Sequence, residues 1–99
     1  MRILAIERPV PSASPAQFTP ELAKAEARRV WELHQQGAIR ELFFRADESA
    51  ALLMLESADI AEARAVLASL PLVQTGLIEF EVIPLRAYPG FARLFDQPA

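Results

Sequence analysis

Three unbroken apolar runs constrain the fold of this chain more than any other feature of its sequence. They are ILAI at residues 3–6, LFF at 42–44 and ALLML at 51–55. Side chains of a β-strand alternate between two faces, so a strand without polar alternation is covered on both faces. The two amphipathic helical segments of the chain can cover only one face of a small sheet. We therefore expect a second copy of the chain to cover the other face, as a homodimer or a higher oligomer.

The composition limits the classes of protein and site. The chain has 99 residues, of which 53% are hydrophobic and 23% charged, and this favours a single globular domain over residues 1–99. The net charge of −3 and the scattered basic residues argue against a nucleic-acid partner. With no cysteine and one histidine, thiolate and histidine-rich metal sites are excluded. No apolar run reaches the roughly 18 residues of a membrane span and no signal peptide is visible, so we expect no membrane partner and a cytoplasmic location.

The predicted elements follow the order strand, helix, strand, strand, helix, strand. Thr19 and Pro20 form a helix start, Gly37 fits the position after its end, and Asp59 with Glu62 resembles a capping box. With right-handed crossovers this order gives the ferredoxin-like βαββαβ plan, an α+β fold with a four-stranded antiparallel sheet and two helices on one face. The predicted strands span residues 1–7, 39–46, 50–56 and 77–85, and the predicted helices span 20–36 and 60–70.

Three further expectations concern the surfaces of these elements. The 3.6-residue period predicts an inner face of the first helix made of Ala23, Ala27, Val30 and His34, widened by Leu33 and Trp31. Prolines at three positions predict a surface loop over residues 9–17, and Pro71 is expected to end the second helix. Residues 86–99 form a tail whose aromatic side chains we expect to pack on the partner subunit.

Two long segments resemble a known family. They are ELHQQGAIRELFFRAD at 32–47 and LPLVQTGLIEFEVIPLRAYPGF at 70–91. Both are similar to the muconolactone isomerase-like branch of the dimeric α+β barrel superfamily, which also holds the YciI-like proteins. The resemblance implies that the sheets of two protomers face each other and form a barrel. It also implies a small organic acid or lactone as ligand and an intramolecular proton shift that needs no cofactor.

Two side chains are candidate catalytic bases for such a proton shift. His34 is the only side chain whose unperturbed pKa is near neutral, and its position would aim it at the mouth of a cleft between helix and strands. It could equally interact with free carbonyls at the helix C-terminus. Glu56 ends an apolar strand, where a poorly solvated cleft would raise the pKa of its carboxyl and make it a base. A solvated strand end is the alternative.

Candidate substrate-binding residues are Arg40, Arg45 and Trp31. An arginine on an inward strand face could hold a substrate carboxylate through two hydrogen bonds, whereas a strand-end position would leave it in water. Trp31 could wall a pocket for an apolar ligand or pack on the partner. Two functions therefore stay open: a cofactor-independent isomerase resembling muconolactone delta-isomerase, and a non-catalytic ligand-binding or assembly protein of the same fold.

Overall fold

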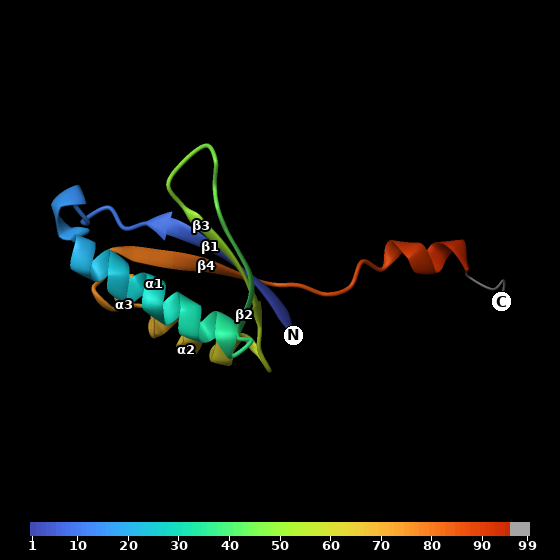
Figure 1. Ribbon diagram of the computed structural model, residues 1–99. Coiled ribbons are helices and arrows are strands. Elements are labelled where there is room, and N and C mark those ends of the chain that lie inside the picture. The colour runs from blue at the N-terminus through green and yellow to red at the C-terminus, as the bar shows by residue number, and fades with distance from the viewer. Residues whose placement is uncertain (96–99) are drawn as a thin grey trace.

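The computed structural model describes residues 1–95, and its centre is a four-stranded antiparallel sheet with strand order β2-β3-β1-β4 (Figure 1). The helices lie together on one face of the sheet. This arrangement confirms the ferredoxin-like plan that the sequence predicts. The elements are β1 (Arg2–Pro9), α1 (Pro20–Gln35), β2 (Ile39–Phe44), β3 (Ala51–Glu56), α2 (Ile60–Ala68), α3 (Pro71–Gln74) and β4 (Ile78–Pro84).

The ends of α1 follow from local chemistry. Thr19 Oγ1 accepts the backbone N–H of Leu22 at 3.2 Å, and Pro20 occupies the first turn, where its missing N–H costs nothing. At the other end Gly37 has a φ of 82°, and Ala38 N–H donates to the carbonyl of Leu33 at 3.0 Å. A glycine in this left-handed conformation ends the helix and turns the chain into β2.

Short helices appear where the sequence predicts none. The helix α2 ends at Ala68, two residues before the predicted end, because the residue before Pro71 is extended rather than helical. Pro71 also begins α3, because its fixed φ suits the first position of a new helix. A 3₁₀ helix over Pro15–Gln17 interrupts the predicted loop, and a second one over Gly90–Leu94 lies in the tail. The helix α3 matters for the site below, because its first turn contacts α1.

The core lies between the sheet and the helices. Ile3 pairs with Leu55 and Ala5 with Leu53 on the covered face of the sheet. From α1, Leu33 is buried and Val30 packs against this cluster, as predicted. The other four predicted inner residues are exposed: Ala23, Ala27, Trp31 and His34. The stripe therefore contacts the sheet only toward the C-terminal half of α1, because alanine side chains are too short to fill the space under its N-terminal half.

The opposite face of the sheet is uncovered in one chain. Apolar side chains occupy its centre, each only half-buried: Leu4, Ile6, Leu52, Met54 and Ile83. Charged side chains on the same face surround them, among them Arg8 beside Glu81. This pattern matches the expectation that the strands are apolar on both faces.

The chain leaves the sheet after Pro84 and does not return to it within the described residues (Figure 1). Leu85 N–H still bonds to the carbonyl of Arg2 at 2.9 Å, and the segment beyond it projects outward. Its apolar side chains are exposed, and the rings of Tyr88 and Phe91 meet edge to face at 5.1 Å. Within residues 1–95 no helix is long and apolar enough to span a membrane.

Candidate functional site

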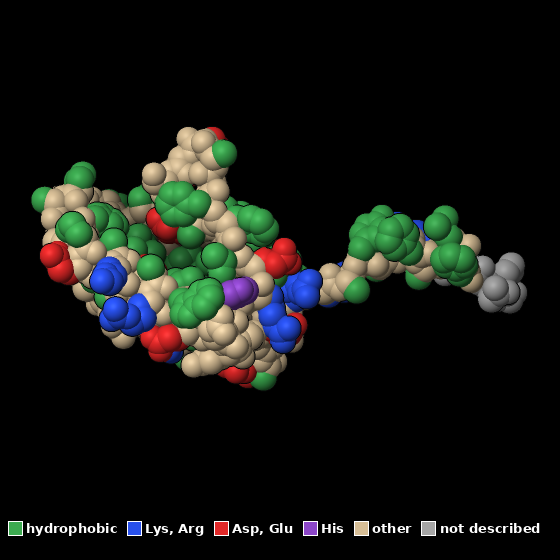
Figure 2. Space-filling view, in the orientation of Figure 1, with side chains coloured by type: hydrophobic (Ala, Val, Ile, Leu, Met, Phe, Trp, Pro, Cys, Tyr) green, Lys and Arg blue, Asp and Glu red, His purple; other side chains and the backbone are tan. Residues whose placement is uncertain are grey.

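An apolar cleft of about 400 Å³ opens between α1 and the sheet. Figure 2 shows hydrophobic side chains gathered in a hollow between α1 and the β2–β3 hairpin. Clefts of this volume suit small organic ligands. The walls come from α1 (Ala23, Ala27, Val30), from the strands (Leu42, Phe43, Phe44, Ala51, Leu53, Ile78, Phe80) and from the start of α3 (Leu72).

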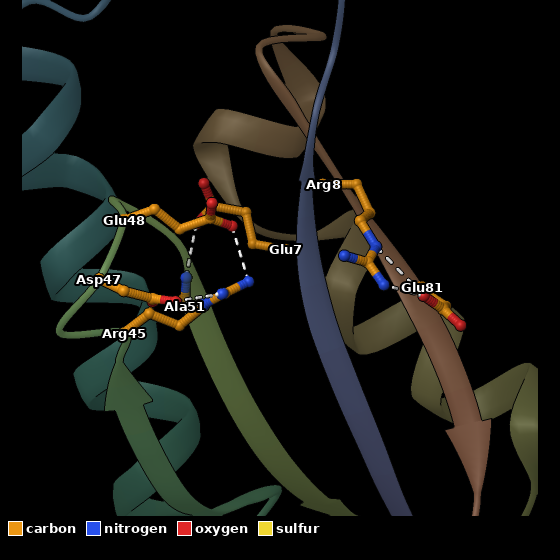
Figure 3. A network of polar contacts seen from close by, with 7 residues as sticks. All are labelled: Glu7, Arg8, Arg45, Asp47, Glu48, Ala51 and Glu81. Atoms are coloured by element: carbon orange, nitrogen blue, oxygen red, sulfur yellow. Dashed lines mark hydrogen bonds and ion pairs between the residues drawn. The ribbon is translucent and has the colours of Figure 1, made fainter.

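Two carboxylates interrupt this apolar lining. Glu7 comes from β1 and Glu26 from α1, and they are the only titratable residues that line the cleft in the described part of the chain. Ala51 N–H donates to Glu7 Oε1 at 3.1 Å (Figure 3), and Leu72 N–H donates to Glu26 Oε1 at 2.9 Å. Each carboxylate is thus held by one oxygen, and within residues 1–95 the other oxygen has no hydrogen bond from the protein.

The surroundings of these two groups raise the pKa of both. For Glu7 the cause is burial, opposed by the hydrogen bond from Ala51. For Glu26 burial is again the largest cause; the bond from Leu72 opposes it, and the negative charge of Glu7 raises the pKa further. A carboxyl group whose pKa is moved upward in an apolar cleft is suited to take up and return a proton near neutral pH.

The structure places His34 at the C-terminal end of α1. Its side chain is exposed, and its Nδ1–H donates to the carbonyl of Ile39 at 2.8 Å, since a carbonyl oxygen can only accept. Its ring lies 6.4 Å from that of Trp31, centroid to centroid, and Trp31 is 62% exposed. Neither side chain lines the apolar cleft.

Glu56 and Arg40 lie together around a different, polar hollow near the end of α1. Glu56 Oε2 is 2.7 Å from the N-terminal ammonium of Met1, and this bond is the largest cause that lowers the pKa of Glu56. The shift is opposite to that expected for a carboxylate in a poorly solvated cleft. Arg40 Nε donates to the carbonyl of Gly37 at 2.8 Å, so this guanidinium also supports the turn after α1.

Arg45 holds the turn between β2 and β3. Its Nε and Nη2 donate to the two oxygens of Asp47 at 2.8 and 2.6 Å, and its Nη1 donates to Glu48 at 2.7 Å (Figure 3). Asp47 raises the pKa of Arg45, and Arg45 lowers the pKa of Asp47. The guanidinium is therefore engaged within its own turn.

None of the predicted site residues lines the apolar cleft; these are His34, Glu56, Arg40, Arg45 and Trp31. Their predicted roles in catalysis and substrate binding stay predictions.

The sequence contains a signal for these two carboxylates, although neither is among the predicted site residues. Glu26 lies on the same helical stripe as Ala23, Ala27 and Val30, at the spacing of a buried face. Glu7 follows Ile3 and Ala5 at the two-residue period of the covered face of β1. A carboxylate at an otherwise apolar position of a buried period is a candidate site residue. Within residues 1–95 no group of three or more histidine, cysteine, aspartate or glutamate residues could hold a metal ion.

Solved structures with the same fold support this description. Muconolactone isomerase matches with a TM-score of 0.71 and 24% identity, over 90% of this chain and 92% of that one. The 5-chloro-2-hydroxyhydroquinone dehydrochlorinase of Burkholderia phenoliruptrix AC1100, solved with 2,5-dihydroxybenzoquinone, matches with a TM-score of 0.67 and 15% identity, over 91% of this chain and 98% of that one. At these identities the likeness establishes the fold.

A search of curated proteins gave no match. The family itself follows from a comparison with family models, in which the muconolactone delta-isomerase model matches residues 3–90. The matched range contains Glu7, Glu26 and Leu72, which lie on β1, α1 and α3. The chain belongs to the muconolactone delta-isomerase family.

Proposed function

We propose that the protein is a cofactor-independent isomerase that binds a small organic acid or lactone in the apolar cleft, with Glu26 as the group that moves the proton. One observation carries this proposal. The carboxyl of Glu26 is fixed by Leu72 N–H inside an apolar cleft, and its surroundings raise its pKa. Fixed orientation and a pKa moved upward are the two properties that a general base in such a reaction requires.

The proposed chemistry moves one proton between the Glu26 carboxyl and the substrate. The Glu26 carboxylate takes a proton from a carbon next to an unsaturated carbonyl, and the electron pair of that C–H bond moves into the conjugated system as a dienolate. The carboxyl then returns the proton to a different carbon, so the double bond shifts and the charge on Glu26 is restored. By their names, the muconolactone isomerase rearranges a lactone and the dehydrochlorinase removes hydrogen chloride from its substrate.

Proton transfer can be measured directly by incubating the protein in D₂O with a panel of unsaturated lactones and following deuterium incorporation by NMR. We expect Glu26→Gln to lower the exchange rate by about 10² or more, because positioned proton transfer contributes this much. The glutamine oxygen can still accept the bond from Leu72, so the fold should persist. The matched control is Glu32→Gln, an exposed position on the same helix. Equal exchange in wild type and Glu26→Gln would reject the proposal, and ligand binding without any exchange would favour the non-catalytic alternative.

We further propose that the active form is a homodimer built on the uncovered face of the sheet, with the tail packed on the partner. The support is the row of half-buried apolar side chains across that face, including Leu52 and Met54. Side chains of both charge signs lie around this row. The tail carries exposed Tyr88, Phe91 and Leu94 away from its own subunit. The cytoplasm stays the predicted compartment.

A further inference from the structure

We propose that the ligand cleft continues into a hollow beside the loop over residues 10–18, the loop hollow, and that the two together take unsaturated lactones or acids with an aryl-sized apolar substituent. The inference rests on the proposed function for the unsaturated part of the ligand, which occupies the cleft beside Glu26. The loop hollow holds the substituent. The inference therefore adds a subsite, and it makes the loop after β1 a determinant of ligand size.

The loop hollow lies at one end of the sheet and has a volume of about 640 Å³. The walls that it does not share with the cleft come from the loop after β1, from Ser49 in the β2–β3 turn and from Leu77 before β4. Ile6 pairs with Leu52, so the end of β1 and the β2–β3 turn lie at the same end of the sheet (Figure 1). The loop and the turn can therefore enclose one space.

The loop hollow adjoins the cleft, because four residues line both: Glu7, Phe44, Leu72 and Ile78. Among them Phe44 is 66% exposed, so its ring offers apolar surface at the junction. A ligand that fills only the cleft leaves part of this ring in water. A ligand that extends past the junction covers more of it, and the burial of aromatic surface stabilises the complex.

The lining of the loop hollow suits an apolar group. Most of the side chains that the loop contributes are apolar, among them Val10, Ala13 and Phe18. The gain from moving an apolar group out of water grows with the area that is buried. A benzene ring fits within the volume of the hollow, and such a ring buries more area than a methyl group does. The substituent that uses this space best is therefore aryl-sized.

The loop is held by its own contacts, so the hollow is formed without a ligand. Ala13 N–H donates to the carbonyl of Val10 at 2.9 Å, and Gln17 N–H donates to the carbonyl of Ser14 at 3.0 Å. The side chain of Gln17 returns the contact, since its Oε1 accepts the N–H of Ser14 at 2.7 Å. Three prolines restrict the backbone further. A wall that is already ordered costs little conformational entropy when a ligand binds.

The test compares two lactones with the same unsaturated ring by isothermal titration calorimetry. These are β-angelica lactone, which carries a methyl group, and its analogue with a phenylethyl group in place of the methyl. We expect the wild type to bind the phenylethyl lactone at least about tenfold more tightly, because the larger group buries more apolar area. Ala13→Leu fills the loop hollow from the loop, and Ser49→Leu fills it from the β2–β3 turn. In each variant the preference should shrink to about twofold, while the affinity for β-angelica lactone stays within about twofold of wild type.

The matched control is Ser12→Leu, which adds the same side chain at an exposed position of the same loop that lines neither space. It should bind both lactones as the wild type does. Equal affinity of the wild type for the two lactones, binding of neither, or a preference that survives in folded Ala13→Leu or Ser49→Leu would overturn the inference. Deuterium exchange into β-angelica lactone tests Glu26 without the loop hollow, because this lactone lacks the large substituent. Failure of the subsite and failure of the proposed reaction are therefore distinguishable.

Discussion

The carboxylate of Glu26 on α1 accepts a hydrogen bond at 2.9 Å from the backbone N–H of Leu72, a residue in the first turn of α3. The first N–H groups of a helix have no partner within the helix, so α3 offers a donor that a longer α2 would have used internally. Pro71 creates this donor by ending α2 and starting a new helix. The break between α2 and α3 thereby fixes the orientation of Glu26, the proposed base, on α1.

Replacing Glu7 by glutamine should lower the pKa of Glu26. The negative charge of Glu7 is one of the causes that raise this pKa, and glutamine removes it. The measurement is a carbon-detected NMR titration of the Glu26 side-chain carboxyl in wild type and variant. Glu79→Gln, which lies outside the cleft, should leave the titration unchanged. An identical Glu26 midpoint in wild type and Glu7→Gln would show that the two carboxylates are not coupled.

The raised pKa of Glu26 also predicts how the free energy of unfolding depends on pH. A carboxyl group whose pKa is higher in the folded than in the unfolded state contributes stability below its unfolded pKa, and this contribution is lost as pH rises through its folded pKa. Glu26 is such a group. The free energy of unfolding of wild type should therefore fall relative to that of Glu26→Gln as the pH rises from about 4 to about 8. Urea titrations at several pH values measure the difference, and a constant difference would contradict the shift.

Filling the cleft should block ligand binding with little effect on stability. Ala27 is exposed and borders the cleft, so the larger side chain of Ala27→Leu would occupy space that a ligand needs. Because leucine is a good helix former, we expect the free energy of unfolding to change by less than about 1 kcal/mol. Binding of an unsaturated lactone from the exchange assay should weaken by at least about tenfold, the cost of about two lost methylene-sized contacts. Ala65→Leu, at an exposed position of α2 away from the cleft, is the control, and unchanged binding in Ala27→Leu would place the ligand elsewhere.

The two faces of β3 should respond differently to a buried charge. Leu53 lies in the core at 4% exposure, so Leu53→Asp should cost several kcal/mol at every protein concentration. Met54 lies on the uncovered face, so Met54→Asp should weaken the association of two protomers. The melting temperature of this variant should then depend on protein concentration differently from that of wild type. Analytical ultracentrifugation reports the assembly directly. A folded wild-type monomer at micromolar concentration would contradict an interface of roughly 800 Å² per partner.

The periodic apolar pattern predicted the fold well, because element order and crossover handedness leave few alternatives. Thr19, Gly37 and Asp59 mark helix ends correctly, since their local chemistry decides the conformation. The double apolar character of β1 and β3 likewise predicted a sheet that is apolar on both faces. These features depend on spacing along the chain, which the sequence states directly.

The site could not be predicted in the same way. Glu7 and Glu26 are 19 positions apart in sequence and belong to different elements, and only the packing of α1 against the sheet brings them to one cleft. Trp31 and His34 fit the apolar stripe by period, but the rotation of α1 on the sheet exposes both side chains. The pairing of Glu56 with the N-terminal ammonium depends on the register of β1 against β3. Such distances follow from tertiary structure, which periodicity does not specify.

Removing the tail should weaken self-association while leaving the sheet intact. A chain that ends at Leu85 keeps the hydrogen bond from Leu85 to the carbonyl of Arg2, so the last strand stays paired. It lacks Tyr88, Phe91 and Leu94, whose exposed apolar surface we expect to pack on the partner. Circular dichroism should report an unchanged core, and sedimentation a weaker dimer. Wild-type association in the shortened chain would contradict a role of the tail in assembly.

His34→Asn decides between the base predicted from the sequence and Glu26. Asparagine at this position would lose the bond that His34 Nδ1–H donates to Ile39, which should cost about 1 kcal/mol or less at an exposed helix end. Because His34 does not line the cleft, we expect deuterium exchange to continue at the wild-type rate. Circular dichroism controls for folding. A fall in the exchange rate of about 10² or more with the fold intact would instead identify His34 as the proton-transferring group, and Glu26→Gln in the same assay would then retain most of its rate.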